Sequence, residues 1–341
     1  MNIFVVISMT LFAVLGGGSA LAARVSETGA GLSPAGVALD WDGRLVYVSG
    51  YSIFEWGGSF SVPGAVNLKN IVAGPDGFWL SDPDGNQVFH RPYSGAPTPF
   101  PVPTPNAGLG GMVMGPDGNI WFTEITANKI GRLTPAGTFA EFPVPTAGSS
   151  PFAITSAPDG NLYFVEYNGN KIGQITTSGM ITEYPIPTPG SHPSGIAASR
   201  ACLAFTESSA NQIGVFEIPD LAVVAEHPVP TANSLPWQIV HGSDRTFYFT
   251  ERFGNRIGVI ANAGGQEPEP AIEYPVPTPA SNPTSLVLDR QGRIWFGESA
   301  AIKIGLLEPS VPGDLNGDGK VDVADVFSLI NFLFAGGPAP K

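Results

Sequence analysis

The chain is poor in cysteine and in charge. Its 341 residues include one cysteine, Cys202, so no intrachain disulfide can form. Cys202 lies in the apolar segment "ACLAFTE", which is typical of an inert core thiol. Charged residues make up 13 % of the chain and give a net charge of −13. Because phosphate groups repel such a protein, we expect no nucleic-acid partner.

Long hydrophobic runs are absent except at the N-terminus. An apolar run from Ile3 to Leu15 is followed by the cleavage pattern Ala20-Leu21-Ala22. We interpret residues 1–23 as a signal peptide and expect a secreted or cell-surface protein that does not contact the membrane after cleavage. No Lys or Arg precedes the run, so an uncleaved membrane anchor is the alternative.

Helical periodicity is also missing, whereas glycine (43) and proline (34) are abundant. The chain instead repeats an eleven-residue motif in five copies, "WFTEITANKIG", "YFVEYNGNKIG", "AFTESSANQIG", "YFTERFGNRIG" and "WFGESAAIKIG". Their glutamates recur at intervals of 41 to 47 residues and are Glu124, Glu166, Glu207, Glu251 and Glu298. Two degenerate copies precede them, with Asp82 and Ser49 in the glutamate position.

Each repeat contains four short β-type runs separated by Asp-Gly, Asn-Gly or Ser-Gly turns. Four strands every forty-odd residues indicate one blade of a β-propeller. We therefore predict an all-β fold, a seven-bladed propeller of four-stranded blades over residues 24–309. We expect it to be a monomer.

The last run of each repeat, such as "EFPVP" or "EYPIP", has prolines at alternate positions. Only an edge strand tolerates this loss of N–H donors, so we assign the run to the outermost strand. His227 replaces the aromatic residue in one such run and is expected at the surface. The seventh repeat lacks the run, and we predict that residues 24–28 close the ring in its place.

The composition changes after residue 309, and we treat residues 310–341 as a separate appendage. "DLNGDGKVDVAD" places possible calcium ligands at loop positions 1, 3, 5, 7, 9 and 12, with Gly319 at the turn. The predicted Ca²⁺ ligands are Asp314, Asn316, Asp318, Lys320 (through its carbonyl), Asp322 and Asp325. A solvated acidic turn is the alternative. An amphipathic helix is expected to follow.

The appendage resembles a single type I dockerin repeat, the calcium loop and helix that binds cohesin domains. Dockerins normally have two such repeats, and positions 10 and 11 are Val323 and Ala324 rather than a hydroxyl pair. The resemblance implies a cohesin-like partner, and a stabilising or anchoring tail is the alternative.

The propeller repeats resemble those of the streptogramin lyases, the virginiamycin B lyase family. The resemblance implies Mg²⁺-assisted elimination across the ester of a cyclic depsipeptide, with two histidines and two glutamates. Carried onto this chain, the histidine positions fall on Trp237 and Thr284, and one glutamate falls on Asn282. Only Glu298 matches, so we keep it as the catalytic candidate and predict that the chemistry is lost.

Two interpretations of the repeated glutamates stay open. They form a ring that faces the central channel, or each accepts backbone N–H groups and joins neighbouring blades. The residue after the proline that begins the inner strand of a repeat, such as Pro151 or Pro236, also has two interpretations. Phe152 and Trp237 either stack on a ligand at the channel mouth or pack between blades. His192, near the same mouth, is a ligand-binding candidate or a solvated loop residue.

The sequence thus favours a secreted ligand-binding or scaffolding propeller, with a glycan or cyclic peptide as ligand. An active lyase that uses Glu298 and Mg²⁺, a carbohydrate-active propeller and a purely structural surface protein are the alternatives.

Overall fold

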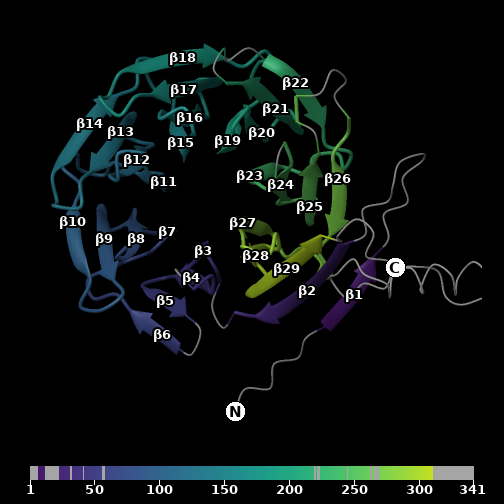
Figure 1. Cartoon of the computed structure of the whole chain (residues 1–341), viewed down its shortest axis with the longest axis horizontal. Coiled ribbons are helices and arrows are strands. Elements are labelled where there is room, and N and C mark those ends of the chain that lie inside the picture. Colours follow the sequence, from purple (N-terminus) through teal and green to yellow (C-terminus); the bar gives the residue numbers. More distant parts are fainter. Residues whose placement is uncertain are drawn as a thin grey trace, which may run out of the picture.

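The computed structural model describes residues 7–11, 23–30, 33–40, 42–55, 58–218, 220, 223–243, 245–261, 263–264 and 269–309. Seven antiparallel sheets are arranged around a central axis, and chain order follows the ring (Figure 1). The predicted seven-bladed propeller is confirmed. The proposed calcium loop and helix lie outside the described residues. Within the described part, no helix has the length and hydrophobicity needed to cross a bilayer.

The first three blades have the strands in the following order. Blade one contains β3 (Gly36–Leu39), β4 (Leu45–Ser49), β5 (Ser52–Glu55) and β6 (Gly58–Ser61). Blade two contains β7 (Asn70–Ala73), β8 (Gly77–Asp82), β9 (Gln87–Pro92) and β10 (Thr98–Pro101). Blade three contains β11 (Leu109–Met114), β12 (Ile120–Glu124), β13 (Lys129–Leu133) and β14 (Phe139–Pro143).

The next three blades follow the same plan. Blade four contains β15 (Pro151–Ser156), β16 (Leu162–Glu166), β17 (Lys171–Ile175) and β18 (Ile181–Pro185). Blade five contains β19 (Pro193–Ala198), β20 (Cys202–Glu207), β21 (Gln212–Glu217) and β22 (Val223–Pro228). Blade six contains β23 (Pro236–His241), β24 (Phe247–Glu251), β25 (Arg256–Ile260) and β26 (Ile272–Pro275). As expected, the proline-containing run is the outermost strand of its blade.

Blade seven joins the two ends of the propeller. Its inner strands are β27 (Pro283–Leu288), β28 (Ile294–Glu298) and β29 (Lys303–Pro309). The fourth strand is β2 (Ala23–Gly29), which pairs antiparallel with β29 from Ala23↔Pro309 to Gly29↔Lys303. The N-terminal segment thus occupies the position that we assigned to residues 24–28. A further strand, β1 (Ile7–Leu11), pairs with the outer edge of β2.

The glycine of each "KIG" motif makes room for the aromatic residue of the neighbouring strand. A Cβ atom on Gly173 would lie 2.1 Å from Cζ of Phe164, far inside van der Waals contact. Phe164 belongs to the fully buried aromatic residues at the centre of the blades. Glycine therefore recurs at this position because the aromatic ring of the adjacent strand occupies the space that a side chain would need.

Neighbouring blades are joined by a threonine in one blade and a glutamate in the next. Thr146, which follows β14, donates from its N and Oγ1 to Glu183 of β18, at 2.8 and 2.7 Å. Lys171 donates to the same carboxylate at 2.7 Å. Because charge-assisted hydrogen bonds are strong, each joint stabilises the interface between two blades.

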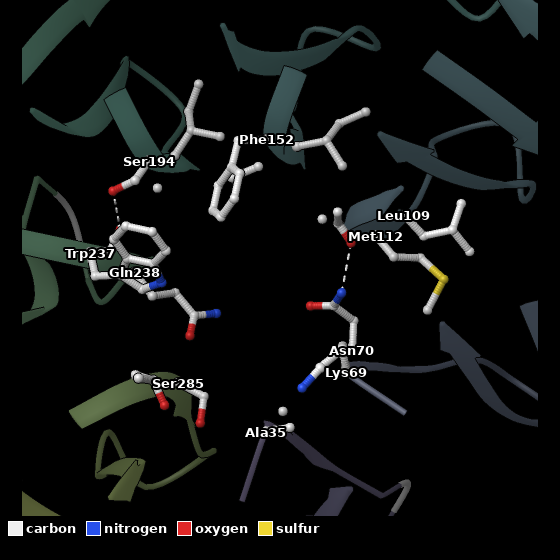
Figure 2. A pocket seen from close by; sticks show the side chains of 18 of the residues that line it. Ala35, Lys69, Asn70, Leu109, Met112, Phe152, Ser194, Trp237, Gln238 and Ser285 are labelled. Carbon is white, nitrogen blue, oxygen red and sulfur yellow. Dashed lines mark hydrogen bonds between the residues drawn. The ribbon is translucent and has the colours of Figure 1, made fainter. Parts of the chain in front are cut away.

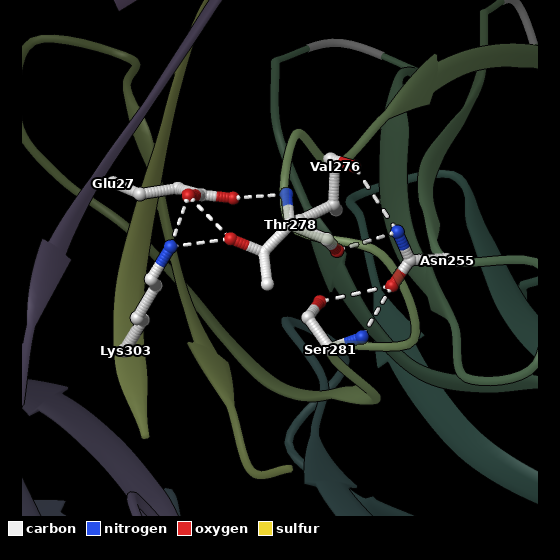
Figure 3. A network of polar contacts seen from close by, with 6 residues as sticks. All are labelled: Glu27, Asn255, Val276, Thr278, Ser281 and Lys303. Atoms are coloured by element: carbon white, nitrogen blue, oxygen red, sulfur yellow. Dashed lines mark hydrogen bonds and ion pairs between the residues drawn. The ribbon is translucent and has the colours of Figure 1, made fainter. Parts of the chain in front are cut away.

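The joint between blades six and seven uses the N-terminal strand. Glu27 accepts hydrogen bonds from N and Oγ1 of Thr278, at 2.8 and 2.7 Å, and from Lys303 at 2.8 Å (Figure 3). Asn255 holds the linker, because its Nδ2 donates to the carbonyls of Val276 and Thr278.

The structure corrects the prediction for His227. Its side chain is buried, and Nδ1 lies 2.9 Å from the carbonyl oxygen of Glu269. Residues 269–271 cover this edge strand, since Ala271 also donates its N–H to the Pro228 carbonyl. Cys202, in contrast, is the buried free thiol that we expected.

Candidate functional site

The repeated glutamates lie inside the blades. Their side chains are fully buried, and none of them lines the central cavity. Within the described residues, the carboxyl oxygens of Glu124, Glu166, Glu251 and Glu298 accept no hydrogen bond from a backbone N–H group. Both interpretations of these five residues are therefore wrong. They neither face the channel nor accept backbone N–H groups.

Among the carboxylates at the repeated position, Asp82 alone accepts backbone N–H groups, as the second interpretation predicts. Its two carboxylate oxygens accept the backbone N–H groups of Val66 and Asn67 at 2.9 and 2.8 Å. The shorter aspartate side chain leaves its carboxylate within reach of the incoming linker. The inter-blade role that we assigned to the repeated glutamates belongs to the outer-strand glutamates, such as Glu183.

Burial raises the pKa of each repeated glutamate, and a neighbouring outer-strand glutamate adds to the effect. The pKa of Glu124, Glu166, Glu207 and Glu298 rises to about 7, and that of Glu251 to about 8. Hydrogen bonds and the Lys171 ammonium lower the pKa of the adjacent Glu183, although burial opposes the shift. Below about pH 7, the pair of Glu166 and Glu183 therefore holds one neutral and one ionised carboxyl group.

A concave site of the described structure is a cavity of about 390 Å³ on the propeller axis. Every blade contributes to its lining, and one contributor in each blade is the residue after the inner-strand proline or its equivalent. The residues at this position are Ala35, Lys69, Gly110, Phe152, Ser194, Trp237 and Thr284. The volume falls in the range of small-molecule sites.

Phe152 and Trp237 form an aromatic wall on one side of the cavity (Figure 2). Their rings meet edge to face, with centroids 5.2 Å apart. Both are partly exposed, so they contribute to the lining and to the packing between blades. The structure thus places both rings at the cavity and in contact between blades, and their role in stacking on a ligand stays a prediction.

His192 lies on the rim of this wall. Its ring packs against Tyr167 with centroids 4.8 Å apart, and Nδ1 lies 2.9 Å from Ser209 Oγ. His192 is not among the residues that line the cavity. Its backbone φ of 49° places it in the left-handed region at the entrance to the strand.

Polar groups project into the cavity from the other sides. Gln238 accepts the N–H of Leu286 at 2.8 Å, and its amide nitrogen points into the open space (Figure 2). Across the cavity, Asn70 donates to Gly110 O and Ser81 Oγ, while its amide oxygen points inward. Ser285 is 4 % exposed, and its hydroxyl has no partner within the described residues.

Sequence reasoning missed Lys69, Asn70, Gln238 and Ser285. A signal for Lys69 and Asn70 exists, because "IVAGPDG" from Ile71 aligns with "ITSAPDG" from Ile154. The alignment places Lys69 and Asn70 at the positions of Phe152 and Ala153. Gln238 and Ser285 come directly after Trp237 and Thr284, the residues that follow the inner-strand proline in blades six and seven. They could be recognised only once the ring had brought the strands together.

The comparisons with known proteins agree with this architecture. The model of the virginiamycin B lyase family matches residues 58–305. The chain belongs to the virginiamycin B lyase family. The resemblance inferred from the repeats is thereby confirmed. No curated protein sequence gives a significant match.

Solved structures of the family superpose on the propeller. Virginiamycin B lyase from Staphylococcus aureus is 30 % identical, with a TM-score of 0.75, over 84 % of this chain and 99 % of that one. A streptogramin B lyase is 28 % identical over 89 % and 98 % of the two chains, also with a TM-score of 0.75. A catalytically inactive histidine-to-alanine variant of the S. aureus enzyme, solved with quinupristin, is 29 % identical over 89 % and 99 %.

The Mg²⁺ ion that the family implies does not fit the residues at this cavity. Asn282, in the place of the family glutamate, accepts a hydrogen bond from Arg252 Nε at 3.1 Å, so a cation already occupies its oxygen. Glu298 points into the blade. The described cavity lining contains no carboxylate, the ligand type that Mg²⁺ prefers.

Proposed function

We propose that this protein is a secreted ligand-binding propeller of the virginiamycin B lyase family that lacks the lyase chemistry. The cavity lining carries this proposal, since Lys69 is its only ionisable side chain within the described residues. Elimination needs a base for the α-proton and an acid for the leaving oxygen. One lysine supplies at most one of these roles.

Family membership supports the alternative, a metal-dependent lyase. The test incubates the full chain with quinupristin and Mg²⁺ and separates the products by liquid chromatography with fragment mass spectrometry. Because elimination leaves the mass unchanged, a new retention time and linear fragments would reveal ring opening. We expect an intact ring. Linear product from the wild type that is lost in Glu298→Gln would refute the proposal.

We further propose that residues 310–341 bind Ca²⁺ and tether the propeller to a cohesin-like partner. The ligand spacing supports calcium binding. Calorimetric titration of the full chain with Ca²⁺ should give one site that is abolished by Asp314→Ala together with Asp318→Ala. Asp220→Ala, far from the loop in sequence, is the control. Equal calcium binding by the double variant would contradict the proposed ligand set.

A further inference from the structure

The lining of the axial cavity is positively charged, whereas the protein as a whole is acidic. The protein has a net charge of −13, yet the described cavity lining contains one charged side chain, the cation Lys69. Lys69 is exposed, and within the described part of the chain it forms no ion pair. Its ammonium group therefore faces the opening without a counter-ion from the described protein.

A second cation lies at the rim on the opposite side of the ring. The Arg252 guanidinium lies over the Trp237 ring, 4.5 Å from its centroid, and Nε donates to Asn282. These contacts fix the group and are made to neutral partners. No described carboxylate forms an ion pair with Arg252, whereas Lys129, Lys171 and Lys303 each pair with an outer-strand glutamate.

The neutral part of the lining suits a polyhydroxylated ligand. Gln238 presents an amide donor, Asn70 an amide acceptor, and Ser285 a buried hydroxyl without a partner. A buried hydroxyl normally has a hydrogen-bond partner, so the Ser285 group points to one that comes from a ligand. Phe152 adds an aromatic surface of the kind that packs against the C–H groups of a sugar ring.

From these groups together we propose that the cavity binds an acidic saccharide, with its carboxylates held by Lys69 and Arg252. This inference rests on the proposed binding function and names the ligand class. A cavity of about 390 Å³ has room for one or two sugar units. A peptide carboxyl terminus has the same charge but fewer hydroxyl groups for the amide and serine positions.

The test compares two ligands that differ only in charge. Digalacturonic acid and its dimethyl ester are titrated into the full chain by calorimetry, as are N-acetyl-trialanine and its amide. We expect the diacid to bind about tenfold more tightly than the diester. Lys69→Gln and Arg252→Gln should each lower the affinity for the diacid by about three- to tenfold and leave the affinity for the diester unchanged. Arg200→Gln, in an exposed turn at the far ends of β19 and β20, is the matched control.

The other outcomes separate the two proposals. Equal affinity for diacid and diester, unaffected by both variants, would overturn the acidic ligand and leave a neutral-ligand protein. Binding of the peptide acid but not of either saccharide would overturn the sugar and keep the carboxylate. If wild type binds none of the four probes, the acidic saccharide is overturned as the ligand class, and the proposed binding function does not fall with it.

Discussion

At the scale of single residues, the repeated glutamates are the chemically most unusual groups of the described chain. A neutral carboxyl group buried beside an ionised one avoids the repulsion that two charges would suffer in a medium of low dielectric constant. Glu166 illustrates this arrangement beside Glu183, whose charge is held by Lys171 and Thr146. The eleven-residue motif therefore preserves buried acids whose protonation is coupled to folding.

The free energy of unfolding should depend on pH because of these groups. A folded pKa of about 7, above the ordinary glutamate value of 4.5, means that the folded state binds more protons than the unfolded state between these two pH values. Their stabilising contribution is complete below about pH 4.5 and is lost as the pH rises through 7. Glu27, Glu141 and Glu183 have a lowered pKa in the folded state, so their stabilising contribution is lost as the pH falls below about 4.5. The two effects together predict maximal stability near pH 5.

Glu166→Gln tests this prediction, because glutamine resembles the neutral acid. Urea unfolding should show the variant more stable than wild type at pH 8, by on the order of 1 kcal/mol, and a shallower decline between pH 5 and 8. Glu269→Gln, on an exposed segment, is the control. A variant that loses stability equally at both pH values would show that Glu166 is charged in the fold.

Ile302 is strained in the backbone. Its φ is 57°, in the left-handed region, where the equivalent residues Asn128, Asn170 and Asn255 lie at 54° to 56°. A β-branched side chain is unfavourable there, whereas asparagine is tolerated. Ile302 is also 45 % exposed and contributes little to the core.

Ile302→Asn should therefore stabilise the protein by about 1 kcal/mol, measured by urea unfolding. The reciprocal change Asn128→Ile should destabilise it by more, because Asn128 Nδ2 also donates to Val144 O and Thr146 O. Loss of stability in Ile302→Asn would mean that the isoleucine side chain makes a larger contribution than its strain removes.

At the scale of elements, stability depends on how one blade is tied to the next. The threonine–glutamate joint recurs around the ring and connects the linker after one outer strand to the outer strand of the following blade. Its partners are 37 to 42 residues apart in the described joints within the repeats. Each joint therefore couples two complete blades.

Thr146→Val removes the side-chain hydrogen bonds of one such joint and keeps the shape of the side chain and the backbone N–H bond. Glu183 and Lys171 both lose a hydrogen bond to Oγ1, so unfolding should require about 1 to 2 kcal/mol less free energy. Thr182→Val, at an exposed position of the same outer strand, should have little effect. Equal stability of the two variants would show that the joint does not stabilise the interface.

At the scale of the whole molecule, the ring is closed by β2. Val25 is 3 % exposed and packs in the core of blade seven, and Glu27 supplies the joint to blade six. The two ends of the propeller thus share one sheet, and β2 lies beside β29 in Figure 1. A break here exposes an edge of β29 and opens the last interface.

Deletion of residues 1–29 should reduce the free energy of unfolding by about 3 kcal/mol or more, because a buried valine and a charged joint are both lost. The matched control is deletion of residues 1–22, which leaves β2 and should change stability far less. Thermal unfolding by circular dichroism measures both. The closure role is wrong if the two truncations unfold at the same temperature.

The sequence by itself determined the repeat, the four-stranded blades and the order of strands within them. Turn residues, strand alternation and edge prolines are local signals, and they recur in the successive repeats. The positions after Pro151 and Pro236 could also be located, because alignment of the blades places them at the same register.

Only the tertiary structure decided which side chains meet. Lys69, Gln238 and Ser285 belong to three different blades, and closure of the ring brings them to one cavity. The environment of Glu166 or Glu298 likewise depends on neighbouring strands and linkers, so its burial could not be deduced from the motif. Strand patterns are set by contacts near in sequence, whereas the charge state of a buried acid and the lining of an axial cavity depend on residues far apart along the chain.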